Sequence, residues 1–404
     1  MSDFDVIRAK CCRKSLTSVL WRCLLPVLLL LSFSLQASEV TVAGFAFSGD
    51  YKTVPERFPY TWQLYRQIQA THQTKKSFSR LINDRLKGLQ TENIVLQSGE
   101  KLVNLKKSDR ALMTVLVLTG ETVATERYGT YYKTFVNLRG DALIFDYKNR
   151  TVIRSYPVSV ALFDATSEAP SEKRITGFID HLIRREDDKG LVTQYIRRLK
   201  KAKLPSDGTR TVQVHGAEID PEVLKFFPDP LRKNPHAIRA MLTEGFGSVL
   251  SAKLNVPMMP ASIGHKDGVM SLRLENGDDY QLNVREGDYL FDIKLDRLVK
   301  KQLVHNSVGT SYVYGAFMSV RFYEPALNTT YIQSGFKNGE VAIVPDGQIS
   351  ADDFAAYQDA IRGLILKFAD TFDNPESGWL AKAASASDIT NQMKTANDII
   401  RKCQ

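Results

Sequence analysis

The sequence reads Val40-Thr41-Val42-Ala43-Gly44 near its start and Val212-Gln213-Val214-His215-Gly216 past its middle. In both runs an apolar residue recurs at every second position, and a glycine ends the run. Such alternation is typical of a half-buried β-strand. Because the same order of predicted elements follows each run, the sequence predicts an internal duplication.

The elements predicted after each opening strand are a polar segment with proline, an amphipathic helix, a short apolar strand, a β-rich run and a closing helix. Apolar residues at helical spacing, such as Phe78, Ile82 and Leu86, indicate the amphipathic helices. Equivalent elements keep a nearly constant separation along the chain. The amphipathic helices are expected at 78–89 and 238–254, the short strands at 94–96 and 256–259, and the closing helices at 175–185 and 353–372.

Each β-rich run predicts an antiparallel meander, and Asn338-Gly339 between two strand-like stretches is a typical hairpin signal. The first run has expected strands at 113–123, 131–138, 142–147 and 151–163, with turns at Gly129, Arg139-Gly140-Asp141 and Lys148-Asn149-Arg150. The second has expected strands at 289–295, 312–322, 329–334 and 341–344, with breaks at Gly309, Glu324-Pro325 and Asn338-Gly339.

This order of elements predicts an α+β fold of two tandem two-layer modules, each a mostly antiparallel sheet with helices packed on one face. The alternative is one large mixed domain whose halves are alike by coincidence. The expected parts are a signal peptide at 1–37, a first module at 38–190, a basic amphipathic helix and linker at 191–208, a second module at 209–372, and a C-terminal helical tail at 373–404.

The first copy resembles the module shared by the N-terminal domain of the Tol-system β-propeller protein and the curli secretion lipoprotein. In that family a Val-x-Val strand ending in an aromatic residue leads into a helix, a strand and a hairpin of alternating Val and Leu. Residues 40–47, 78–89, 92–96 and 112–123 stand in those places here. The family's last hairpin usually has a Thr-Gly turn, whereas this chain has Lys148-Asn149-Arg150 in that place. The resemblance implies a periplasmic, non-enzymatic module of envelope assembly or export, and it carries over no functional residue.

The first 37 residues have the pattern of a cleavable signal peptide. Basic residues precede an apolar run from Leu24 to Leu35, and the small Ala37 follows. This run is about a dozen residues long, whereas a membrane-spanning helix needs roughly 20. Cys23 precedes the apolar run, follows Arg22 and does not fit a lipobox. We therefore expect a periplasmic protein.

The charge and the cysteines bear on partners. The formal net charge of +9 falls to +6 without the presequence, which carries five basic and two acidic residues. Export argues against nucleic acid, so an envelope protein is the expected partner. The basic helix at 191–203 either packs on the first module or lies on an anionic membrane or envelope polymer. Cys403, the one cysteine after the presequence, either joins two chains or is a free thiol on a frayed tail.

Residue patterns that carry chemistry are absent from the sequence. The histidines have no helical i, i+4 partner, and no Gly-x-Ser-x-Gly occurs. Gly245-Phe246-Gly247-Ser248 lacks the features of a nucleotide loop and indicates close packing against a sheet. We therefore assign no catalytic, cofactor-binding or metal-binding residue, and no cofactor. The histidines are His72, His181, His215, His236, His265 and His305.

Tyrosines recur in the two β-rich runs: Tyr128, Tyr131 and Tyr132 in the first, and Tyr312 and Tyr314 in the second. Aromatic strand positions can form a platform for sugars or peptides, or can pair across strands to stabilise the sheet. Three hypotheses for the function follow from the sequence. The first is an envelope interaction or scaffold protein that uses its sheet edges and the groove between modules; the others are an enzyme with a dispersed site and a binding protein for a small ligand or envelope polymer.

We predict that the exported protein begins at Ser38 or close to it, because Ala37 supplies the small residue that signal peptidase requires. N-terminal sequencing of the protein recovered from the periplasm measures this. A lipid-modified or uncleaved product would contradict the prediction.

Overall fold

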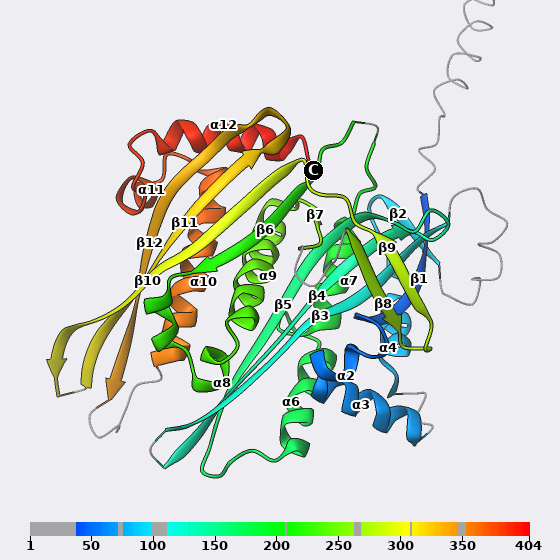
Figure 1. The fold of residues 1–404 in the computed structure, drawn as a ribbon, viewed down its shortest axis with the longest axis horizontal. Helices are drawn as coiled ribbons and strands as arrows, with labels where there is room; N and C mark the ends of the chain where they lie inside the picture. The colour runs from blue at the N-terminus through cyan, green and yellow to red at the C-terminus, as the bar shows by residue number, and fades with distance from the viewer. Residues whose placement is uncertain are drawn as a thin grey trace, which may run out of the picture. The chain divides into compact units, whose positions relative to one another are not determined.

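The computed structural model describes residues 38–71, 76–97, 111–128, 130–206, 208–261, 268–307, 309–345 and 353–404. The predicted signal peptide at 1–37, the Gly129 turn, and His72 and His265 lie outside the described residues. The described part combines helices with a large mixed sheet (Figure 1), so the predicted α+β class is confirmed.

The first half of the sheet is built around β1 (Ser38–Ser48). This strand pairs in parallel with β3 (Leu112–Tyr128), and β2 (Ile94–Gln97) pairs with β1 as well. From β3 the chain continues as an antiparallel meander through β4 (Tyr131–Asp146) and β5 (Thr151–Thr166). The strand order is therefore β2-β1-β3-β4-β5.

Helices cover one face of this first sheet. In α6 the buried residues Ile175, Ile179 and Leu182 recur every three or four positions, which points one stripe at the strands. Ile179 and Leu182 share a core with Phe45 and Phe47 of β1. The helices are α2 (Val54–Arg57), α3 (Pro59–Ala70), α4 (Phe78–Leu86), α6 (Glu172–Arg184) and α7 (Leu191–Lys201).

The second half has the same strand order. Here β6 (Val212–Ile219) pairs in parallel with β10 (Tyr289–Asn306), and β7 (Met258–Met259) pairs with the other side of β6. The meander continues through β11 (Gly309–Glu324) and β12 (Thr329–Pro345). The strand order is β7-β6-β10-β11-β12.

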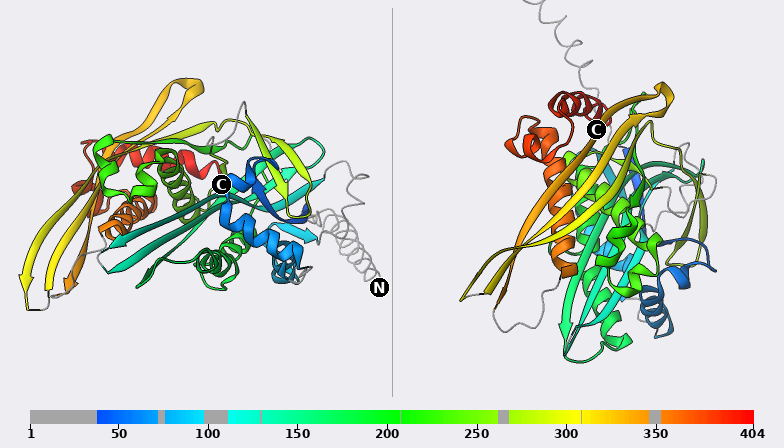
Figure 2. Two further views of the ribbon diagram at one scale, coloured as in Figure 1. Left: turned by 60° about the horizontal axis from the view of Figure 1, so that its bottom comes forward. Right: turned by 60° about the vertical axis from the view of Figure 1, so that its left-hand side comes forward.

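Helices also cover one face of the second sheet, and Figure 2 shows α10 behind the strands of the meander. Phe246 of α9 contacts Phe291 of β10 at 5.5 Å between ring centroids, and Phe368 of α10 contacts Phe336 of β12 at 5.0 Å. The elements are η3 (Pro221–Phe226), α8 (Asp229–Arg232), α9 (Pro235–Leu254), η4 (Pro325–Leu327), α10 (Asp353–Asp373), α11 (Gly378–Ala383) and α12 (Ile389–Arg401).

One sheet runs through both halves because two elements of the second half pair with the first. β7 pairs with β5 at Ser155 as well as with β6. The hairpin of β8 (Val269–Leu274) and β9 (Asp279–Asn283) pairs with β1, and Asn283 meets β5 at Thr151. β1, β3, β4, β5, β9 and β8 thus close a ring around a small apolar core that includes Val115, Leu143 and Leu272.

Glu275, in the turn of the β8–β9 hairpin, binds the N-terminus of α4. Its carboxylate accepts hydrogen bonds from the backbone N–H groups of Phe78 at 2.9 Å and Ser79 at 2.6 Å. Its backbone N–H donates to the Phe45 carbonyl, and its carbonyl accepts from the Tyr65 hydroxyl at 3.1 Å. An anion is favourable at a helix N-terminus, where backbone donors are unpaired.

Several sequence expectations are corrected. Arg139-Gly140-Asp141 lies within continuous β4, and Asn338-Gly339 lies within continuous β12, so neither predicted turn exists. The β8–β9 hairpin and most of α3 were not predicted. The helices of the first half cover one face of its sheet, and the β8–β9 hairpin and α9 of the second half cover the other face.

The apolar stripe of α7 and the thiol of Cys403 are both buried in the protein. The apolar stripe of α7, including Leu191, Tyr195 and Leu199, is buried against the first half, so it is not available to enter a membrane. Cys403 is fully buried after α12, which corrects the expectation of a frayed tail and leaves its thiol out of reach of a second chain. Burial raises the pKa of Cys403 to about 12. No described helix is long and apolar enough to span a bilayer.

We predict that Glu275→Ala lowers the free energy of unfolding by about 1–3 kcal/mol, because the buried N–H group of Phe78 and the half-buried N–H group of Ser79 lose a charged acceptor. Urea unfolding measures the change. Asp278→Ala, in the same turn but at an exposed position, is the control and should have little effect. Equal losses in the two variants would show that the contact with α4 contributes nothing.

Candidate functional site

The titratable residues of the described part of the chain form no metal-binding cluster. No three His, Cys, Asp or Glu side chains among them gather closely enough to hold a metal ion. The described histidines His181, His215, His236 and His305 are exposed and lie on different elements. His215 Nδ1 lies 2.9 Å from Asp292 Oδ1, and solvent screens this exposed pair.

A buried ion pair joins the two halves between β4 and α9. Arg139 Nε donates to Glu244 Oε2 at 2.7 Å, and the two side chains are 4% and 13% exposed. Thr119 Oγ1 donates to the same oxygen, and Arg139 also donates to Thr122 and Asn137. Removing either charge would leave the other buried and unpaired, so the pair holds α9 against β4.

Asp141 lies two residues from Arg139 on the same face of β4 and is buried. Burial, together with the negative charge of Glu244, raises the pKa of Asp141 to about 7. Asp141, Glu244 and Thr243 line a cavity of about 30 Å³, and Thr243 Oγ1 has no hydrogen-bond partner within the described residues. A polar cavity of this size fits a water molecule rather than a substrate. The cluster is therefore a joint between the halves.

An aromatic groove of about 230 Å³ opens farther along the same interface. Phe354 of α10 contacts Phe135 of β4 at 5.3 Å and Phe227 after η3 at 5.6 Å, while Phe163 of β5 is 43% exposed at the edge. Of the charged residues that line it, Lys225 is paired with Glu222, Arg232 with Asp229 and Asp353 with Lys300. This groove is where a small ligand held between the halves would bind.

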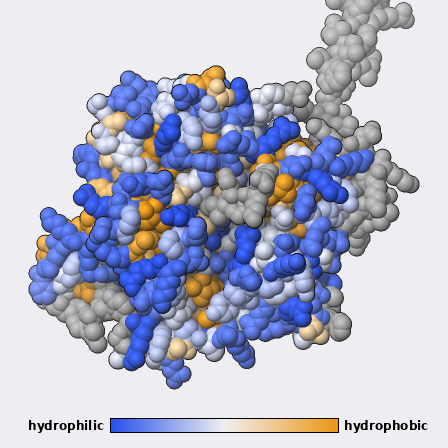
Figure 3. Space-filling view, viewed as in Figure 1, coloured by the Kyte–Doolittle hydropathy of each residue, from blue (hydrophilic) through white to orange (hydrophobic). Residues whose placement is uncertain are grey.

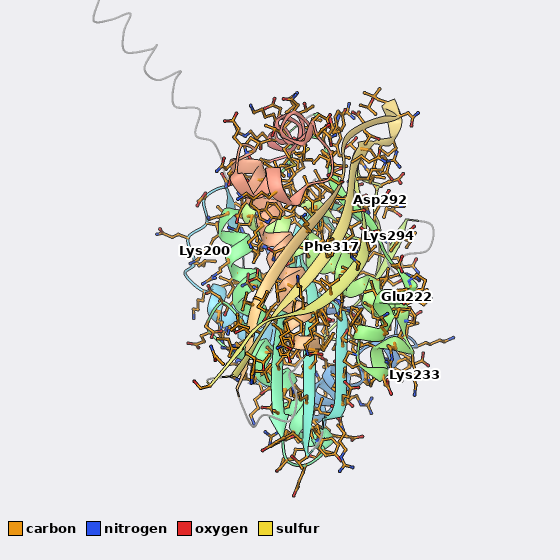
Figure 4. The ribbon with its side chains drawn as sticks, turned by 90° about the vertical axis from the view of Figure 1, so that its left-hand side faces the viewer. Lys200, Glu222, Lys233, Asp292, Lys294 and Phe317 are labelled. Atoms are coloured by element: carbon orange, nitrogen blue, oxygen red, sulfur yellow. The ribbon has the colours of Figure 1, made fainter. Side chains whose placement is uncertain are left out.

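The face of the second sheet turned away from α10 is open. Figure 4 shows Phe317, Asp292 and Lys294 on this face, and Figure 3 shows hydrophobic surface over the meander. Gly315 of β11 and Gly339 of β12 are register partners. On the outer face, therefore, neither β11 nor β12 has a side chain at the level between Phe317 and Val313. The resulting depression, about 350 Å³, we call the outer trough. Its lining is Val299, Val313, Gly315, Phe317, Lys337, Asn338, Gly339, Trp379, Lys382 and Ala383.

The edge strand β12 borders the outer trough. Gly335 donates its N–H to Ser385 Oγ at 2.8 Å and accepts from the Ser385 N–H at 2.9 Å, so its backbone groups point away from β11. In an antiparallel pair every second residue has this orientation. The outward-facing residues that follow are Lys337, Gly339, Val341 and Ile343. Among the described strands, none pairs with this edge, and outside the strands Ala384 forms a single bridge with Phe336.

The tyrosines are not gathered into one platform. Tyr314 faces α10, where its hydroxyl donates to Asp353 Oδ1 at 2.6 Å and its ring contacts Tyr357 at 5.2 Å. Tyr131 is 56% exposed at the far end of the first meander. The expected close packing at Gly245-Phe246-Gly247-Ser248 is found at Gly247, where a Cβ atom would lie 3.4 Å from Val214 of β6 and 3.6 Å from Pro157 of β5.

The sequence did not predict the outer trough, the open edge of β12 or the buried ion pair of Arg139 and Glu244. Gly315 carried no signal on its own, and Gly339 was interpreted as a turn. Arg139 and Asp141 were also placed in a turn. The β-rich sequence on both sides of each of these predicted turns was the signal that could have indicated a continuous strand, because it fits one long strand as well as two short ones. No protein-family model matches this chain, and no curated protein shows significant sequence similarity to it.

We predict that the protein loses stability as pH rises from about 4 to 7, because over this range folded Asp141 keeps its proton while the unfolded chain does not. The slope from this one group is up to about 1.4 kcal/mol per pH unit. Asp141→Asn should flatten the curve and melt above the parent protein at pH 8. Thermal melts at pH 5 and 8 measure this, with the exposed Asp84→Asn as control. Equal pH dependence in parent and Asp141→Asn would contradict it.

Proposed function

We propose that this chain is an exported, non-enzymatic interaction protein of the bacterial cell envelope, which binds a partner protein along the open edge of β12. The observation that carries the proposal is a stretch of edge strand with outward backbone groups and exposed apolar side chains. Val341 is 62% exposed and Ile343 is 60% exposed. Long apolar edges invite strand pairing and are usually blocked in proteins. Addition of a strand from another chain is a common mode of recognition at such edges.

The sequence supports the cellular setting of this proposal. The presequence has the pattern of an export signal, and the first half resembles modules of envelope assembly and export. An extended segment of an envelope protein is therefore the partner that we propose for the edge.

We also propose that the two halves are copies of one module. Their strand orders agree, and each opening strand has an irregularity at the same place in its Val-x-Val-x-Gly run. β1 shifts register between Val42 and Gly44, and β6 shifts between Val214 and Gly216. A bulge at equivalent positions supports a common origin, because bulges are retained within families.

We predict that a photo-reactive amino acid at Val341 forms a covalent adduct with one envelope protein in living cells. The same amino acid at Leu327, which is 65% exposed but lies outside β12, is the matched control and should form none. Gel electrophoresis and mass spectrometry detect the adduct.

A second variant tests whether formation of this adduct requires a partner strand paired with the edge of β12. The Val341 N–H points away from β11, so Val341→Pro removes a donor to an added strand but none of the β11 pairing. With the photo-reactive group moved to Ile343, this substitution should abolish the adduct in a protein that still folds by thermal melt. Equal adducts at 327 and 341, or none at either, would overturn the proposed function.

A further inference from the structure

We propose that the segment accepted by the β12 edge has an aromatic residue with an acidic residue two positions to one side and an aliphatic residue two positions to the other. This inference rests on the proposed function and names the chemistry of its partner. Lys337, Gly339 and Val341 lie on the outer face of β12, and an added strand places one of its side chains beside each of them. The chemistry at these three positions therefore determines which side chains the added strand should have.

The aromatic residue is assigned to the position opposite Gly339. Gly339 and its register partner Gly315 have no side chains, so the floor of the outer trough is formed by the side chains of Val299 and Val313, which reach over them. An added strand would aim its side chain across this apolar floor. Phe317 and Trp379 line the trough and offer ring surfaces for stacking. Covering a strand glycine with a cross-strand aromatic ring also shields its exposed backbone.

The acidic residue is assigned to the position opposite Lys337. The outer trough is lined by two lysines, Lys337 and Lys382, and by no acidic residue. Neither lysine forms an ion pair within the described part of the chain, although both are exposed. Arg297, which lies over the Phe317 ring at 4.1 Å, adds a third positive charge to this face. A carboxylate beside these groups gains attraction, and a cation is repelled.

The aliphatic residue is assigned to the position opposite Val341. Beyond the outer trough, Val341 and Ile343 continue the same face with exposed aliphatic side chains, and Val313 lies beside Val341 in register. A third aliphatic side chain in this row buries apolar surface. An anionic lipid would match the lysines but leave the outward N–H and C=O groups of β12 unpaired, which favours an extended peptide.

The test uses three synthetic capped peptides and the fluorescence of Trp379. Trp62→Phe leaves Trp379 as the only tryptophan after residue 37. The first peptide carries Val-Thr-Phe-Thr-Asp, the second carries the reverse order for a parallel strand, and the third has Lys in place of Asp. We expect one of the first two to shift Trp379 emission on titration. The Lys peptide should bind about two- to five-fold more weakly, which is the size of a cross-strand charge effect.

Lys337→Glu should reverse the preference, so that the Lys peptide binds better than the Asp peptide. Lys233→Glu changes the net charge equally on another part of the molecule (Figure 4) and should leave the preference intact. Thermal melts confirm that each variant folds, and Lys337→Met, which removes the charge without adding one, should abolish the preference.

Equal binding of Asp and Lys peptides, or an emission shift with phosphatidylglycerol vesicles but with no peptide, would overturn this inference. If the adduct at Val341 forms and depends on the edge, those results leave the proposed function standing. If neither the adduct nor peptide binding is seen, both fall.

Discussion

The sheet of the first half buries side chains on both of its faces, and its own helices cover only one of them. The second face must therefore be covered by the second half, and the rest of the structure follows from this constraint. The β8–β9 hairpin covers the apolar end near Val115 and Leu143. α9 covers the middle, where Arg139 and Asp141 meet Glu244.

The second sheet has no such covering on its outer face. The β8–β9 hairpin pairs with β1 of the first half, and α9 packs between the opposite face of the second sheet and β5. The halves thus share a strand order but differ in what they expose. Only the second half has an open sheet face beside an open edge strand, and the proposed interaction function depends on this difference. A binding surface requires apolar groups and backbone donors that are not already buried or paired within the folded protein.

The sequence predicted the strands and helices whose pattern is long and periodic, such as α6, α10 and the β3–β5 meander, because burial of one stripe or face leaves a regular trace. It failed where a local signal competed with pairing. Asn338-Gly339 predicts a turn, yet β11 pairs with both residues and Gly339 is not at positive φ. Asn276-Gly277 is the real hairpin turn, with Gly277 at φ 97°. Contacts between the halves, such as Glu275 with α4, leave no periodic trace at all.

A segment of the same chain, at Ala384 and Ser385, pairs with the outer edge of β12. The position at which this pairing stops is relevant to the partner proposed for the edge. Ala384 forms a bridge with Phe336, and Ser385 bonds the backbone of Gly335, so this edge is competent to take up another segment. Past Phe336 the pairing gives way to Lys337, with Lys382 beside it. Lysine on an edge discourages pairing between identical copies, because their like charges repel. The same charges attract an acidic segment, so the feature that opposes self-association also favours a partner of opposite charge.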